Sequence, residues 1–215
     1  MLELGGKSPF IVCADADLEA AVEGAMREAE ALLDTFSALL RIAQVEGASP
    51  RAGFRDVDLS AAVEAVADAY RPDAEDAGHR LCAEVTPGLA VHGDQELLTQ
   101  AAANLVENAL RHTPAGTRIG IRLSRGHGGV VRLVVEDDGP GIPPGEMERV
   151  FEPFHRLEAS RNRGTGGTGL GLTIARRAVE GHGGTIALAN RPGGGLLVTV
   201  RLPRADGMAS EGGQG

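Results

Sequence analysis

The stretch NLVENALRHTP, residues 104–114, carries the pattern that decides the fold of this chain. Asn104 and Asn108 stand four residues apart and Arg111 follows three residues later, so the three side chains share one face of a helix. Asp94 precedes this helix as a suitable N-cap. Two amides and a guanidinium beside apolar neighbours can serve a Mg²⁺ that also holds phosphate oxygens. The alternative is an ordinary solvated helix face.

A second motif, EDDGPGI, follows a predicted strand that ends in two valines. Asp137 stands where this strand stops, and Gly139 and Gly141 let the backbone turn sharply and approach a ligand closely. A carboxylate at the floor of an apolar pocket can accept a hydrogen bond from an exocyclic amine, such as that of adenine. The alternative is a plain Asp-Gly turn.

A third motif, GGTGLGL, places Gly167, Gly169 and Gly171 immediately before a predicted helix. Helix N-termini present free N–H groups and the positive end of the helix dipole, so glycines there admit a phosphate close to the backbone. Taken alone, the motif indicates no more than a flexible loop. It is neither a Rossmann fingerprint, because no parallel βαβ unit surrounds it, nor a P-loop, because the lysine is missing.

The remaining pattern indicates an α+β fold. A helix is predicted in LSAAVEAVADAYRPDAEDAG, where Pro72 permits an early break, and short strands in HRLCAEV and LAVHG. Two hairpins, TRIGIRLSR with GVVRLVVED and GTIALAN with GLLVTVRLP, alternate apolar and polar residues. We therefore expect a two-layer α/β sandwich with a mixed, mostly antiparallel sheet, helices on one face and a long N-terminal helix before it.

Composition excludes several classes of partner. The formal net charge of −9 argues against a nucleic-acid binder, and no apolar run approaches a membrane span. Cys13 and Cys82 form no metal-ligand spacing and no disulfide framework, so we expect a cytoplasmic protein.

The three motifs, in this order and at these separations, resemble the ATP-binding domain of sensor histidine kinases. That superfamily also contains DNA gyrase, mismatch-repair ATPases and a heat-shock chaperone. The resemblance covers roughly Phe54 to Pro203: NLVENALRHTP matches the N box, EDDGPGI and GTGLGL match the two glycine boxes, and VFEPFHRLEASRNRG matches the phenylalanine box and ATP lid. It implies a mobile lid between Gly139 and about Thr168 that closes over ATP. The part from Ala159 to Thr168 has no large apolar anchor, so we expect it to be disordered without nucleotide.

The resemblance also implies roles for residues. Asn104 and Asn108 would hold Mg²⁺, Arg111 and His112 would lie near the phosphates, and Asp137 would bind the adenine amine. The rest of the implied ATP site belongs to the glycine boxes, the phenylalanine box and the lid: Gly139, Gly141, Ile142, Phe151, Phe154, Arg156, Gly167, Thr168, Gly169, Leu170, Gly171 and Leu172.

The first N-box position separates branches of the superfamily. ATPase members carry a Glu there, which activates water, whereas this chain has Asn104, an amide that cannot act as a base. Glu107 is a neighbour on the helix but points off the line of Asn104 and Asn108. Phosphoryl transfer to another group is therefore favoured over hydrolysis of ATP.

The resemblance implies a dimerisation hairpin and a response regulator as partners. MREAEALLDTFSALLRIAQVE is similar to the second helix of that hairpin, and apolar residues recur in steps of four and three from Val22 to Ala43. We expect self-association through residues 22–45; the alternative is one amphipathic helix packed on the domain. None of the six histidines has the acceptor context, so autophosphorylation is not expected. An ATP-binding module without turnover and an anti-sigma-factor-type Ser/Thr kinase remain as alternatives.

The opening LELGGKSPFIVCADADLEAAVEGA resembles the catalytic-glutamate motif of aldehyde dehydrogenases, with Glu3 as the general base. The nucleophilic cysteine loop and the NAD-binding domain of that family have no counterpart, so dehydrogenase activity is not expected. The simplest account is a chimeric or truncated reading frame, whose intact parent is membrane-anchored. The expected division is an aldehyde-dehydrogenase-like segment, a hairpin helix, a linker, the ATP-binding domain and a disordered tail: 1–25, 26–46, 47–57, 58–203 and 204–215.

Overall fold

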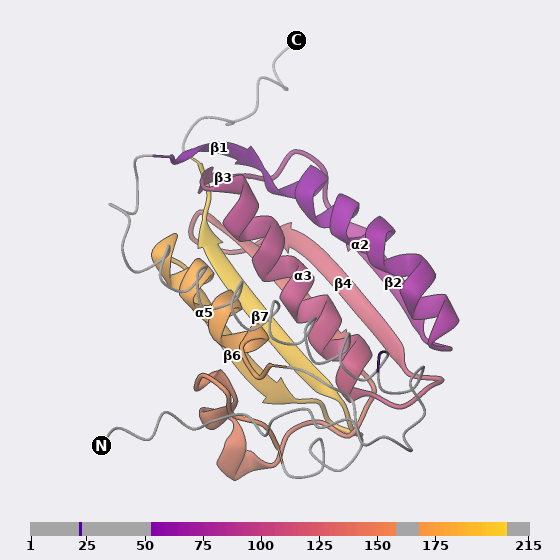
Figure 1. Ribbon diagram of the computed structural model, residues 1–215. Coiled ribbons are helices and arrows are strands. Elements are labelled where there is room, and N and C mark those ends of the chain that lie inside the picture. Colours follow the sequence, from indigo (N-terminus) through magenta and orange to yellow (C-terminus); the bar gives the residue numbers. More distant parts are fainter. Residues whose placement is uncertain (1–21, 23–52, 158–167, 206–215) are drawn as a thin grey trace, which may run out of the picture.

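The computed structural model describes residue 22 and residues 53–157 and 168–205 (Figure 1). Three α-helices cover one face of a five-stranded sheet, and a two-stranded ribbon lies at one end. The helices are α2 (Leu59–Asp76), α3 (Gln95–His112) and α5 (Gly171–Gly181), with short 3₁₀ turns η1 (Pro144–Glu146) and η2 (Arg149–Phe151). The main sheet contains β2 (Arg80–Val85), β4 (Arg118–Arg125), β5 (Val130–Asp137), β6 (Thr185–Asn190) and β7 (Leu196–Pro203), and the ribbon contains β1 (Arg55–Asp58) and β3 (Ala90–Gly93).

The sheet order is β2-β4-β5-β7-β6. The pair β2–β4 is parallel, and the pairs β4–β5, β5–β7 and β6–β7 are antiparallel. The expected mixed, mostly antiparallel two-layer sandwich with helices on one face is therefore confirmed. The hairpin helix, most of the stripe at 22–45, the lid residues 158–167 and the tail from 206 lie outside the described residues.

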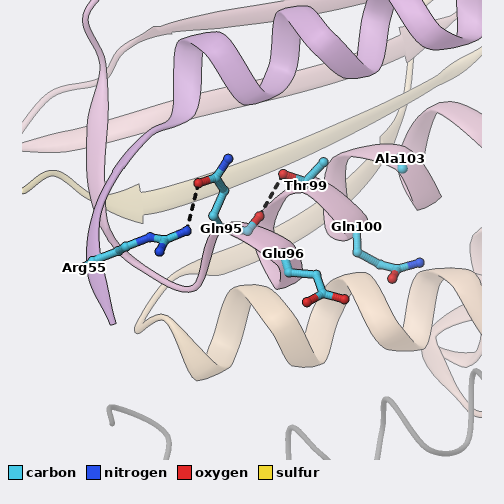
Figure 2. A pocket seen from close by; sticks show the side chains of 6 residues that line it. All are labelled: Arg55, Gln95, Glu96, Thr99, Gln100 and Ala103. Atoms are coloured by element: carbon cyan, nitrogen blue, oxygen red, sulfur yellow. Dashed lines mark hydrogen bonds between the residues drawn. The ribbon is translucent and has the colours of Figure 1, made fainter. Parts of the chain in front are cut away.

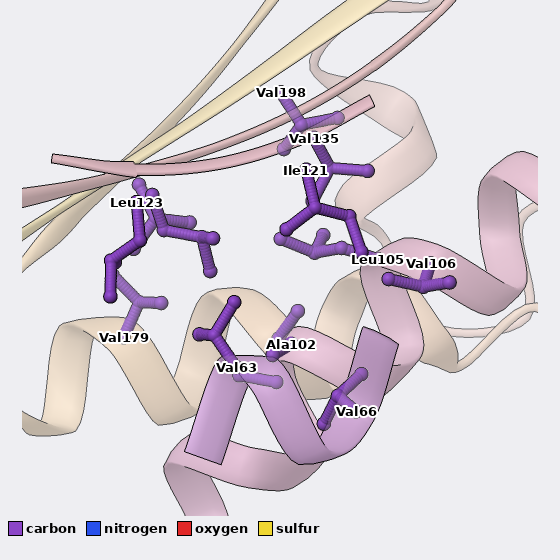
Figure 3. Packing of buried hydrophobic residues seen from close by; sticks show 14 of the residues in the cluster. Val63, Val66, Ala102, Leu105, Val106, Ile121, Leu123, Val135, Val179 and Val198 are labelled. Carbon is purple, nitrogen blue, oxygen red and sulfur yellow. The ribbon is translucent and has the colours of Figure 1, made fainter. Parts of the chain in front are cut away.

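Side-chain alternation along the strands builds the core (Figure 3). On β5, Val131, Leu133 and Val135 face the helices and belong to one apolar cluster with Leu105 of α3. Burying an aliphatic side chain of this size is worth about 1.5–3 kcal/mol, so these contacts outweigh the weak local preferences of each strand. The core fixes α3 against the sheet.

The start of α3 is set by its cap. The Asp94 carboxylate accepts hydrogen bonds from the backbone N–H groups of Glu96 (2.8 Å) and Leu97 (3.1 Å), as the sequence predicted. The helix then runs without interruption to His112. Asn104, Asn108 and Arg111 are thereby held on one regular helix.

The early break that Pro72 permits does not occur. Helix α2 continues through Pro72 to Asp76, and Ala74 beyond the proline is fully buried. The carbonyl that loses its donor belongs to Asp68, an exposed residue, so water can satisfy it. Burial of the last turn outweighs the lost hydrogen bond.

Both boundaries of the expected domain also need correction. Strand β1 pairs with β3 and lies partly inside the expected 47–57 linker, so the fold begins before residue 58. At the other end, Arg204 bridges Val91, and the buried Ala205 donates its N–H to the Ala90 carbonyl at 3.0 Å. The expected tail therefore starts after residue 205, because β3 supplies backbone partners that local sequence does not reveal.

A buried histidine joins the ribbon to two helices. The Nε2 atom of His182 accepts the Asp94 N–H at 2.9 Å, and its Nδ1 lies 2.6 Å from the Ala178 carbonyl, which fixes a neutral tautomer with the proton on Nδ1. The Phe54 ring stacks on the imidazole with the centroids 4.6 Å apart. His182 thus ties the end of α5 to the beginning of α3.

This histidine makes the stability of the fold depend on pH. Burial lowers the pKa of His182 below its ordinary 6.5, so protons favour the unfolded chain. We expect the free energy of unfolding to be highest above about pH 6.5 and to fall as the pH drops toward the folded pKa. Urea denaturation of the chain and of His182→Gln at pH 7.5 and 5.5 measures this. The variant should lose less stability between the two pH values, whereas His127→Gln, in an exposed turn, should leave the loss unchanged.

Candidate functional site

The amides of α3 lie beneath the glycine motif that begins α5. Asn104 is only 8% exposed, and its Nδ2 atom has no hydrogen-bond partner. A methyl group on Gly171 would lie 3.9 Å from the Asn104 Cβ, so the first residue of α5 is directly opposite this side chain. Asn108 is half-buried one turn further along α3. A buried amide end without a partner indicates a polar ligand, since such groups are otherwise satisfied.

The Asp137 carboxylate forms the second part of the site. It is 5% exposed at the end of β5, and its Oδ1 accepts the N–H groups of Gly139 (2.9 Å) and Leu196 (3.2 Å). Burial raises the pKa of Asp137 above its usual 3.8, and these backbone donors offset only part of that effect. Among the described residues, no group donates to its other oxygen, Oδ2. A ligand donor at Oδ2 would therefore stabilise the charged form.

The turn between β6 and β7 supports Asp137, and sequence reasoning missed it. The Arg191 guanidinium donates to the Asp137 carbonyl at 2.8 Å. The Asn190 amide accepts the Ile142 N–H at 2.9 Å and donates to the Ile142 carbonyl at 2.7 Å, which clamps the loop after β5. The sequence predicts only a hairpin connection at RPGG, residues 191–194, although these glycines and the adjoining Gly195 signal a close approach of two backbones.

Two glycines of the first glycine box are required by their surroundings. Gly141 has a φ of +72°, and a methyl group there would meet the Asn190 Oδ1 at 2.5 Å. A methyl group on Gly139 would lie 2.7 Å from the Thr113 side chain, just beyond the end of α3. The box therefore packs directly on both the turn and the helix that frame the site.

The second glycine box is fastened to the phenylalanine box. Gly169, with a φ of +70°, accepts the Phe154 N–H at 3.1 Å, and a methyl group on it would lie 2.9 Å from the Phe154 carbonyl carbon. Phe154 itself has a φ of +63° and is 52% exposed. An exposed aromatic side chain on a left-handed backbone is uncommon outside functional sites. Phe154 and Gly169 therefore fasten the phenylalanine box to the loop that precedes α5.

Several expected site residues have mainly structural contacts. The Phe151 ring belongs to the core, its carbonyl accepts the Thr173 hydroxyl at 2.8 Å, and Arg176 lies over its face at 4.9 Å. Ile142 and Leu172 are also core residues, and Leu170 is fully buried against Ile174. These side chains hold the two glycine boxes in place; half-buried Thr168 lies at the start of the second box, and Gly167 is outside the described residues.

The charged side chains at the end of α3 are already engaged. Arg111 forms an ion pair with Glu107, one turn earlier on α3. His112, which is exposed, and Arg156, which is half-buried, also have partners. Arg111 would have to leave Glu107 to reach a phosphate.

An open hollow of about 480 Å³ lies elsewhere, along the N-terminal half of α3 (Figure 2). Arg55 of β1 and five residues of α3 line it, and Arg55 donates a hydrogen bond to the Gln95 side chain at 3.1 Å. It contains none of the expected site residues, which gather around the C-terminal half of the same helix. None of the helices in the described part of the chain is both long and apolar enough to cross a membrane.

Comparison with known proteins identifies the family of this domain. Residues 93–206 match the family described as histidine kinase-, DNA gyrase B- and HSP90-like ATPases. Residues 1–31 match the aldehyde dehydrogenase family, a fragment too short to include a dehydrogenase site.

The sequence relatives are sensor kinases. The chain is 36% identical over 181 residues to the sensor-like histidine kinase SenX3 of Mycobacterium tuberculosis, covering 84% of this chain and 44% of SenX3. It is 39% identical over 147 residues to the signal transduction histidine-protein kinase BaeS of Escherichia coli, covering 68% of this chain and 31% of BaeS. The chain thus spans less than half the length of these curated relatives.

Solved structures agree. The mycobacterial sensor histidine kinase MprB matches with a TM-score of 0.60 at 32% identity, over 70% of this chain and 97% of that one. Full-length ShkA in complex with AMPPNP matches with a TM-score of 0.73 at 29% identity, over 88% of this chain and 40% of that one. The chain belongs to the histidine kinase-, DNA gyrase B- and HSP90-like ATPase family, and the domain that the structure describes is an ATP-binding catalytic domain of the sensor histidine kinase type.

Proposed function

We propose that this chain binds ATP with Mg²⁺ and presents the γ-phosphate to a histidine on a separate dimerisation hairpin. The observation that supports the proposal is the buried, unpartnered Asn104 amide opposite the first residue of α5, together with the buried Asp137 carboxylate at the end of β5. Each offers one chemistry that the nucleotide requires: an acceptor for the adenine amine, an amide, and backbone N–H groups for phosphate.

The residues present fit a magnesium ion. The unpartnered end of the Asn104 amide lies under the glycine box, and an amide can be turned to present its oxygen instead of its nitrogen. Asn104 and Asn108 would hold the ion, which when bound neutralises charge on the phosphates. Asn104 cannot remove a proton from water, so the site favours transfer over hydrolysis. A response regulator as final acceptor and a cytoplasmic location belong to the same proposal.

Radiolabel transfer tests this. The chain is incubated with γ-labelled ATP, Mg²⁺ and a purified dimerisation hairpin from a related kinase, and acid-labile phosphate on the hairpin is measured. Label should appear on the hairpin and not on this chain. Label on the chain itself would contradict the proposal that the acceptor histidine lies on a separate hairpin. If calorimetry detected no binding of ATP, the proposal as a whole would be contradicted.

We expect Asn104→Ala to reduce the rate of transfer by about ten- to a hundredfold, because it removes one interaction with a charged group, roughly 1.5–3 kcal/mol. Gln100→Ala provides the matched control, since it truncates an amide one turn earlier on α3, at the hollow. If both variants lost the same fraction of the transfer rate, the effect would come from a general disturbance of helix α3 and not from the loss of a group in the site.

A further inference from the structure

The face of the sheet that carries no helices holds two arginines side by side. On β5 the residues Val131, Leu133 and Val135 face the helices, so Arg132 faces the other way. The same alternation on β7 sends Arg201 to this open face. Arg132 and Arg201 are register partners on adjacent antiparallel strands, and both are exposed.

This placement breaks a rule of sheet stability. Residues directly opposite on neighbouring strands have Cβ atoms about 4.5–5.5 Å apart, and like charges at such positions are destabilising. Within the described part of the chain, neither arginine forms an ion pair. By contrast, Arg122 in the adjacent row of the same face pairs with Glu84 at 3.0 Å. The uncompensated pair is thus a local feature of one row.

The whole row extends across four strands. Ser124 of β4 is the register partner of Arg132, and Thr185 of β6 is the register partner of Arg201. The row reads hydroxyl, guanidinium, guanidinium, hydroxyl, so every position can donate a hydrogen bond to an anion. Three interstrand steps give it a length of about 14 Å.

The row is remote from the nucleotide site. Asp137 stands five residues beyond Arg132 along β5, about 17 Å, and it faces the helices while Arg132 faces away from them. Nor does the row follow from a generally basic surface, since the chain carries a formal net charge of −9. A ligand of the row would leave the nucleotide site accessible.

Packing can explain the aliphatic stems of Arg132 and Arg201 but not their charges. Val134 is 2% exposed on the open face, two residues from Arg132, and the stems of long side chains can cover such a residue. Glutamine or methionine stems would do the same without repulsion. The charges therefore call for a separate reason, and positions that break a local rule are typical of functional surfaces.

We propose that the row formed by Ser124, Arg132, Arg201 and Thr185 is a docking surface for a short carboxylate-rich segment of a partner protein. Each guanidinium can bind a carboxylate through two parallel hydrogen bonds, and the hydroxyls add one hydrogen-bond donor at each end of the row. A long polyanion such as DNA would extend beyond the row, where the net negative charge of the chain would repel it.

Fluorescence anisotropy with labelled hexaglutamate at low salt tests the proposal in the full chain. The double variant Arg132→Gln, Arg201→Gln should bind hexaglutamate at least tenfold more weakly, with unchanged ATP affinity by calorimetry. Arg122→Gln, which removes a neighbouring guanidinium that is committed to Glu84, should stay within twofold of the unmodified chain. Arg132→Glu should abolish binding and raise the melting temperature, because it replaces repulsion with attraction to Arg201.

Four outcomes would overturn the proposal. The first is that the chain does not bind hexaglutamate, and the second is that the double variant binds it as tightly as the unmodified chain. The third is that a short DNA duplex binds the chain as tightly as hexaglutamate does. The fourth is that inorganic phosphate, at the same concentration as hexaglutamate, displaces the labelled peptide. Loss of self-association in the double variant would also overturn it, by assigning the row to a second copy of this chain.

Discussion

Replacing Asp137 by asparagine is expected to weaken ATP binding by about ten- to a hundredfold. The adenine amine would donate to the free Oδ2 of a carboxylate that is 5% exposed, and a hydrogen bond to a charged group contributes roughly 1.5–3 kcal/mol. Asparagine places an amide nitrogen there, a donor facing a donor. Isothermal titration calorimetry with ATP and Mg²⁺ measures the change.

The same substitution should not destabilise the chain without nucleotide. A carboxyl group whose pKa is raised by folding contributes stability at low pH, and that contribution is lost as the pH rises through the folded value. The ionised Asp137 carboxylate therefore lowers the free energy of unfolding at neutral pH. The amide oxygen introduced by Asp137→Asn would still accept from Gly139 and Leu196, so urea denaturation at pH 7 should give a free energy of unfolding equal to or above that of the unmodified chain.

Asp138→Asn provides the matched control. Asp138 is exposed and accepts the Arg118 N–H at 2.7 Å, away from the helix side of the sheet. This variant should bind ATP within about twofold of the unmodified chain. Unchanged affinity in Asp137→Asn would remove Asp137 from the site, and a large loss of stability would show that its charge supports the fold.

Replacing Gly195 by alanine should have the largest effect on stability. Gly195 has a φ of +98°, and a methyl group there would overlap the Asp137 carbonyl oxygen. Left-handed backbone strain costs about 1–3 kcal/mol, and the overlap adds to it, so we expect a loss of about 3 kcal/mol or more in the free energy of unfolding. ATP affinity should fall as well, because relief of the overlap displaces Asp137.

Gly193→Ala separates strain from overlap. Gly193 lies in the same turn with a φ of +91°, but a methyl group there would meet no atom within 4 Å. It should lose about 1 kcal/mol and keep its ATP affinity. If both variants lost the same stability, the close approach between the turn and Asp137 would not be the cause.

Local signals in the sequence were sufficient to predict helix α3 and the position of Asp137 at the end of its strand. The cap at Asp94, the i, i+4 spacing of Asn104 and Asn108, and the end of β5 at Asp137 are each set within a few residues. The family resemblance added their roles and the order of the boxes. The antiparallel pairs β4–β5 and β6–β7 also followed, because a short glycine-rich turn closes each of these hairpins, whereas the antiparallel pair β5–β7 joins strands that are distant in the sequence.

Long-range partners explain what sequence reasoning missed. Asn190 and Arg191 act on residues 48 and 54 positions earlier, so no local pattern marks them. Strand β1 needs β3 as its partner, and Ala205 needs the Ala90 carbonyl. The helix through Pro72 persists because tertiary burial of Ala74 overrides a local breaker.

The neighbouring strands β5 and β7 are separated in sequence by the glycine boxes, η1, η2, α5 and β6. The connection between β5 and α5 leaves the sheet after Asp137 and leads to α5, which packs beside α3. Because the closure entropy of a loop grows only with the logarithm of its length, about 0.6 kcal/mol per doubling, this connection can lengthen or shorten at little cost to the sheet. Packing thus constrains the sheet and α3, whereas an insertion in the connection between β5 and α5 would leave the strand order unchanged.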